Sequence, residues 1–108
     1  MKLPGGGDMG KLLKQAQKMQ ADLAKAQAEI AQMEAEGSSG GGAVTARVNG
    51  SYELLALKID PAAIDPGDPE TLEDLVLTAV NQAIKGVRSQ SEARMAQAAG
   101  PMGGMMGL

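Results

Sequence analysis

Residues 9–36 read MGKLLKQAQKMQADLAKAQAEIAQMEAE. Apolar residues recur in this stretch at alternating steps of four and three, the heptad spacing of a coiled-coil helix. This apolar seam consists of Leu12, Ala16, Met19, Leu23, Ala26, Ile30 and Met33. The pattern predicts one helix over 9–36, with Asp8 as its N-cap and Gly37 as the residue that ends it. A helix of that length, roughly 42 Å, should project from a small domain, so a second chain is expected to cover the seam.

The same stretch contains a basic stripe. This lysine stripe consists of Lys11, Lys14, Lys18 and Lys25. At about 100° per residue the four lysines fall within roughly 60° of one another, at heptad positions that face away from the seam. Such stripes usually lie in solvent. Here, however, the acidic residues Asp22 and Glu29 fall at heptad position g, outside the stripe, and cations near a helix N-terminus are mildly unfavourable. The stripe therefore indicates an anion-binding face.

The Gly-rich stretch 37–42 predicts a flexible connector, because no Gly-Lys-Ser/Thr follows that would make it a phosphate-binding loop. Residues 43–60 then predict two antiparallel strands joined at Asn49-Gly50, a favoured type I′ turn. In the second strand, Leu55, Leu57 and Ile59 should lie on one face and Tyr52, Leu54 and Ala56 on the other. An isolated hairpin is marginal in water, so a larger sheet is expected, such as one shared between two chains.

Asp68-Pro69 marks the start of a second helix, predicted over 69–98. Its apolar residues recur at 3.6-residue spacing and form its core-facing stripe: Leu72, Leu75, Val76, Ala79, Val80, Ala83, Ile84 and Val87. The prediction is therefore a single α+β domain over 9–98. A disordered N-terminus (1–8) and a disordered Gly/Met tail (99–108) are expected to flank it.

The composition argues against catalysis. The 108 residues include no cysteine, histidine, tryptophan or phenylalanine, and Tyr52 is the only aromatic residue. Thiol chemistry, imidazole bases and the commonest metal ligand are thus missing. Six acidic residues lie within 60–74, but their spacing does not match a calcium-binding loop, and turn and capping roles explain most of them. We expect no enzyme activity, metal, cofactor or small-molecule substrate.

No apolar run approaches the roughly 20 residues needed to span a bilayer, and the N-terminus has no apolar signal core, so a cytoplasmic protein with no membrane partner is expected. The net charge of −3 is unevenly distributed. Residues 1–28 hold five lysines and two acidic residues, a net +3, whereas 60–74 amount to −6. Local field rather than net charge steers a polyanion.

The second helix contains a further basic set, Lys85, Arg88 and Arg94. These residues could bind phosphate, or they could simply complement the helix dipole. Binders of single-stranded nucleic acid rely on several aromatic residues. A single tyrosine therefore favours duplex phosphate contacts.

Several short sequence segments follow one another in a characteristic order. They are Lys11–Gln20 (KLLKQAQKMQ), the Gly-rich break, Val48-Asn49-Gly50, Lys58–Pro61 (KIDP), and Leu72–Val76 (LEDLV) followed by Asn81. Over roughly 9–95 the chain resembles the YbaB/EbfC family of bacterial nucleoid-associated proteins. The resemblance implies a helix–sheet–helix protomer and an intertwined homodimer whose helices project like tweezers around duplex DNA. It also implies that the first and last helices make the DNA contacts, which here would be Lys11, Lys14, Lys18, Lys25, Lys85, Arg88 and Arg94.

The hypothesis is therefore a cytoplasmic, nucleoid-associated homodimer. It should bind duplex DNA mainly through phosphates, with low sequence specificity, and influence nucleoid organisation and gene expression. The apolar seam is assigned to the dimer interface, and its partner is either its own copy or the last helix. The alternative hypothesis is a dimeric coiled-coil module that binds other proteins and makes no direct DNA contact.

Overall fold

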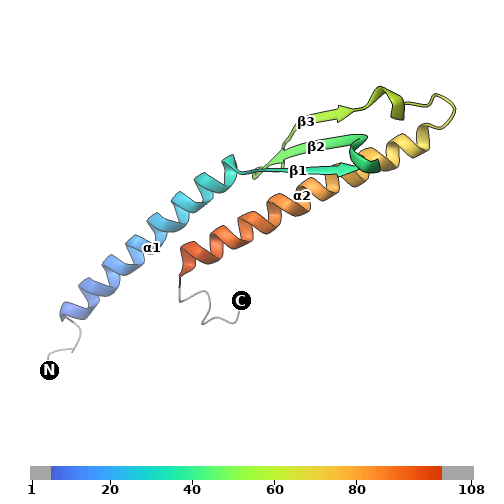
Figure 1. Cartoon of the computed structure of the whole chain (residues 1–108). Helices are drawn as coiled ribbons and strands as arrows, with labels where there is room; N and C mark the ends of the chain where they lie inside the picture. The colour runs from blue at the N-terminus through green and yellow to red at the C-terminus, as the bar shows by residue number, and fades with distance from the viewer. Residues whose placement is uncertain (1–5, 101–108) are drawn as a thin grey trace.

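The computed structural model describes residues 6–100. A long helix, α1 (Gly6–Gln32), leads into a three-stranded sheet, β1 (Glu34–Ser39), β2 (Val44–Asn49) and β3 (Leu54–Ile59). The second helix, α2 (Pro69–Ala99), follows (Figure 1). The predicted α+β class is confirmed, and the molecule is elongated, at 83 × 24 × 16 Å. Of the segments expected to be disordered, 1–5 and 101–108 lie outside the described residues, whereas 6–8 belong to α1. Asp8 is thus inside the helix and not its N-cap.

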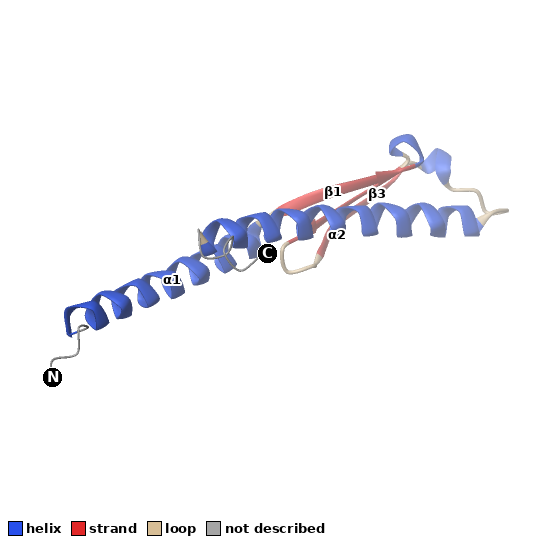
Figure 2. Ribbon diagram, turned by 90° about the horizontal axis from the view of Figure 1, so that it is seen from below, coloured by secondary structure: helices blue, strands red, loops and turns tan. Residues whose placement is uncertain are grey.

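The sheet is antiparallel in the order β1-β2-β3, and α2 lies along one of its faces (Figures 1 and 2). Alternate residues of the central strand, Val44, Ala46 and Val48, are buried there. They form the core with residues of α2 spaced at four-residue steps: Ala79, Ala83 and Val87. The alanines allow the helix to approach the sheet closely. The predicted cap is present, since the Asp68 carboxylate accepts hydrogen bonds from the backbone N–H and the hydroxyl of Thr71.

β1 corrects the prediction that the first helix continues to residue 36. Helix α1 ends at Gln32, and Glu34–Ser39 pair in register with Asn49–Val44 of β2. Local helix propensity is overridden by tertiary contact. Ala35, Gly37 and Ser39 face inward, and Gly37 lies so close to α2 that a Cβ there would overlap the Ala79 carbonyl oxygen.

The Gly-rich stretch is ordered, contrary to the prediction of a flexible connector. Its first residues belong to β1, where the Ser38 amide donates to the Gln82 side chain and the Ser39 hydroxyl donates to the Leu75 carbonyl. A short 3₁₀ turn, η1 (Gly40–Gly42), then leads back to β2. All three of its glycines have positive φ, which a side chain would disfavour. The glycines therefore form a tight connection between two paired strands.

The type I′ turn predicted at Asn49-Gly50 does not form. A four-residue loop, 50–53, joins β2 to β3, and its positive φ occurs at Tyr52 (61°) and not at Asn49 or Gly50. The Asn49 side-chain oxygen accepts from the amides of Ser51 and Glu53, so it organises the loop. Gly50 is required for a different reason. A Cβ at this position would overlap the Ile30 carbonyl at the end of α1.

β3 begins at Leu54, later than the second predicted strand, which included Tyr52, and its faces differ from the prediction. A register shift between Arg47 and Val48 pairs Val48 with Leu54 and Ala46 with Leu57. Directly paired residues share a face of the sheet. Leu54, Leu57 and Ile59 therefore lie on the α2 side, and the bulge explains why simple alternation failed. A short 3₁₀ turn, η2 (Pro61–Ala63), follows β3.

Candidate nucleic-acid interface

The N-terminal half of α1 projects beyond the end of α2 (Figures 1 and 2). Every residue from 9 to 18 is exposed. Further along α1, Leu23 and Ile30 are half-buried and Ala26 is fully buried. The two helices lie side by side over this part of α1. The C-terminal half of the apolar seam is thus covered within one chain, and its N-terminal half, Leu12 and Ala16, is open.

Lys11, Lys14 and Lys18 lie on this projecting half and are all exposed. At 100° per residue, they cluster about 180° around the helix from the arc formed by Met9, Leu12, Leu13 and Ala16. Those apolar side chains are also exposed, at 66% for Met9, 61% for Leu12 and 60% for Leu13. One surface of the projecting half can therefore contact a polyanion while the opposite surface contacts protein.

Lys25 is exposed, but it lies on the part of α1 that runs beside α2. Together with Ala28, Glu29, Gln32 and Met33 it lines a shallow hollow on the surface of α1. Glu29 is one turn away on the same helix, and its carboxylate attracts Lys25 as well as Arg94. Lys25 therefore contributes less to the basic surface than the three lysines before it.

Arg94, a predicted DNA contact, is engaged within the chain. Its Nε lies 2.7 Å from Oε2 of Glu29, so the ion pair joins α2 to α1. The hydrogen bond from Arg94 lowers the pKa of the Glu29 carboxyl, and the same bond raises the pKa of Arg94. Sequence reasoning missed this pair because its members are 65 positions apart.

Lys85 and Arg88 form a second basic group, separate from the projecting lysines. Both are exposed on α2 beside the sheet, whereas Lys11, Lys14 and Lys18 lie at the far end of the molecule (Figure 1). The Arg88 guanidinium carbon is 5.9 Å from the centre of the Tyr52 ring, within the range of a cation–π contact. The structure thus brings together three of the seven predicted DNA contacts and places the others elsewhere.

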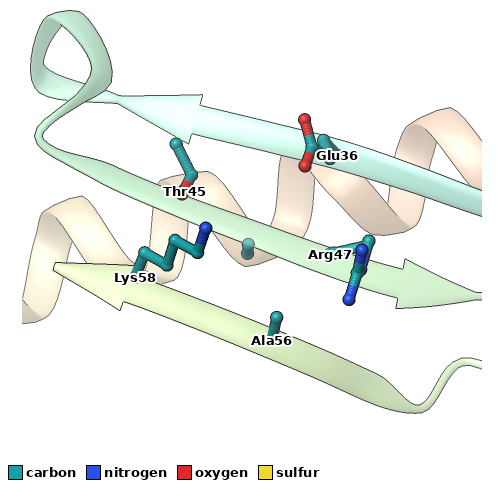
Figure 3. A pocket seen from close by; sticks show the side chains of 6 residues that line it. Glu36, Thr45, Arg47, Ala56 and Lys58 are labelled. Carbon is teal, nitrogen blue, oxygen red and sulfur yellow. The ribbon is translucent and has the colours of Figure 1, made fainter.

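The face of the sheet turned away from α2 has balanced charge. Figure 3 shows a shallow hollow on it, lined by Glu36, Thr45, Ala46, Arg47, Ala56 and Lys58. The Nε of Arg47 is 3.2 Å from the Glu34 carboxylate, across the β1–β2 pair. Because two acidic residues accompany the two basic ones, this face offers a polyanion little attraction.

The acidic stretch 60–74 has local roles. The Asp60 carboxylate accepts from the Ala62 amide at 3.0 Å, and Asp65 accepts from the Gly67 amide at 2.9 Å. Within the described part of the chain, no three acidic side chains converge in a way that could hold a metal ion. Neither helix is long and apolar enough, over the same residues, to cross a membrane.

A family model described as the YbaB/EbfC DNA-binding family matches residues 5–102. The chain belongs to this family. Among its relatives, a nucleoid-associated protein of Streptomyces griseus is 51% identical over 98% of this chain and 97% of its own length. A nucleoid-associated protein of Clostridium perfringens is 50% identical over 97% of this chain and 94% of its own length.

The fold of this YbaB/EbfC family member is also found in a solved structure. It resembles the crystal structure of an uncharacterized protein from Helicobacter pylori, with a TM-score of 0.66 at 24% identity. The match covers 88% of this chain and 97% of the other. At that identity the likeness concerns the fold alone.

Proposed function

We propose that this YbaB/EbfC family member is a nucleoid-associated protein that binds duplex DNA as a homodimer. The observation that supports it most directly is the projecting half of α1, where Lys11, Lys14 and Lys18 share one fully exposed arc. The family description and the names of the relatives favour DNA as the anion. Through such binding the protein would influence the organisation of the nucleoid and the expression of genes.

Phosphates are the expected targets of these lysines. A lysine ammonium is a flexible point charge, and α1 offers no arginine fork that could read guanine from the major groove. Phosphate contacts position a protein on DNA but convey no base sequence. Binding should therefore tolerate many sequences.

A second copy of the chain is the proposed cover for an apolar side surface, defined here as Leu54, Leu57, Ile64, Leu77 and Val80. β3 is an edge strand, and α2 packs mainly on β1 and β2, so the α2 side of β3 is left open. Leu54 and Ile64 are 49% and 51% exposed, and Leu77 is 60% exposed. Leu77 and Val80 line one shallow hollow, and large exposed apolar surfaces typically mark protein interfaces.

The apolar seam makes a smaller contribution in this proposal. Its residues from Leu23 onward already lie beside α2 of the same chain, so Leu12 and Ala16 are the part that a second chain can reach. Two projecting helices held by one dimer would then present two lysine arcs to the same duplex.

The proposal is tested by measuring duplex affinity for two variants with the same change in charge. Lys14→Glu alters the projecting arc, and Lys58→Glu alters the balanced outer face of the sheet. Fluorescence anisotropy with a duplex of random sequence should show a loss of at least about tenfold for Lys14→Glu, because one phosphate contact in each chain of the dimer is replaced by repulsion. Lys58→Glu should bind nearly as the parent does. Equal losses would show that net charge, and not the arc, governs binding.

A further inference from the structure

The ion pair between Glu29 and Arg94 joins the two long helices within the stretch where α1 lies beside α2, near the sheet end of α1. It is the only salt bridge between α1 and α2 among residues 9–100, whose side chains the structure describes. A shallow hollow beside the pair is lined by Met33, directly after α1, and by four residues of α2: Gln90, Ala93, Arg94 and Gln97. The helices are therefore loosely packed on the side of the pair lined by this hollow, whereas Ala26, one turn before Glu29 on α1, is fully buried.

The end of α1 nearest the sheet is held firmly. The Gly50 amide donates to the Met33 carbonyl at 2.8 Å, and Gly50 packs directly against the Ile30 carbonyl. Glu29 lies one residue before this anchor. From Glu29 to Lys11 the helix runs about 27 Å. A rotation of about 10° at the anchor would consequently move Lys11 by about 5 Å, which is comparable to the spacing of phosphates along a strand.

We propose that Glu29 and Arg94 are positioning residues for DNA binding, forming a clamp that sets the angle of the projecting lysine arc. The expected effect of the clamp on DNA affinity rests on the proposed function. The clamp itself is a property of the protein without DNA. In this account Arg94 acts through Glu29 and makes no phosphate contact. Asp22 and Lys25 are the other charged groups of α1 near the pair.

The clamp can be tested in the free protein by measuring a distance. The chain has no cysteine, so Gln15→Cys on the projecting half and Ser89→Cys on α2 give two unique sites for spin labels. Labelled chains are diluted with unlabelled protein so that each assembly has one labelled copy. The distance distribution should broaden in Glu29→Gln and in Arg94→Gln, and narrow again in the swap Glu29→Arg with Arg94→Glu. Unchanged distributions in both single variants would overturn the clamp.

The link to DNA is tested with variants that each remove one negative charge. On charge alone, Glu29→Gln and Asp22→Asn should both bind duplex DNA more tightly. The clamp predicts instead that Glu29→Gln binds about threefold more weakly, and that Asp22→Asn binds at least as tightly as the parent. Tighter binding by Glu29→Gln would overturn the positioning role. If the parent protein binds no DNA, the proposed function fails, and the distance measurement still decides whether the clamp exists.

Discussion

Gly37 of β1 lies directly against the carbonyl oxygen of Ala79 on α2, with no room for a Cβ between them. This contact allows β1 to lie closely along the helix, and α2 is the main cover of the sheet. Gly37→Ala should destabilise the fold by about 1–3 kcal/mol, because the strand and helix must separate. Chemical denaturation followed by circular dichroism measures the change.

Gly10→Ala is the matched control for Gly37→Ala. Gly10 is inside α1, and a Cβ there would meet no other atom within 4 Å. Alanine in an exposed helix is favoured over glycine by about 0.5–1 kcal/mol, so this variant should be slightly more stable than the parent. If Gly37→Ala is as stable as Gly10→Ala, the close approach of β1 to α2 is wrong.

The apolar side surface predicts a dimer that a single charge can break. Sedimentation at micromolar concentration should give twice the chain mass for the parent, and Leu77→Glu should shift it towards the monomer because a carboxylate is buried without a partner. Thr78→Glu adds the same charge at the next exposed position of α2 and should remain dimeric. A folded parent monomer would rule out the dimer.

DNA binding and dimerisation should be separable. Lys11 and Lys14 point away from the apolar arc of α1, so Lys11→Glu with Lys14→Glu should abolish duplex binding and leave the dimer intact. Gel shift and sedimentation on the same preparation measure both properties. Dissociation of the double variant into monomers would show that these lysines are structural.

The parts of the fold with long, uninterrupted periodic patterns could be predicted from the sequence. β1 could not, because Glu34, Ala35 and Glu36 favour a helix locally and prolong the pattern of α1. Their extended state depends on pairing with β2 and on contact with α2, which is distant in the sequence. The face occupied by Leu54 was also unpredictable, since a bulge interrupts simple alternation.

The candidate site also has features that could be predicted from the sequence and features that could not. The exposure of Lys11, Lys14 and Lys18 follows from their heptad positions, which are a local property of one helix. The ion pair of Arg94 could not be predicted in this way, because it depends on α2 running back along α1 until Arg94 reaches Glu29. A stripe of cations in a sequence therefore indicates which residues can bind an anion, and only the packing shows which are already paired.

The salt dependence of duplex binding tests the central claim most directly. Two chains offer six lysines from the projecting halves of α1, and each phosphate neutralised contributes about −0.9 to the slope of log K against log[salt]. Affinity should be measured for several unrelated duplexes over a salt series. The account predicts a slope of roughly −5 and similar affinities for all sequences. A slope near zero, or a preference of about a thousandfold for one sequence, would contradict binding through phosphates.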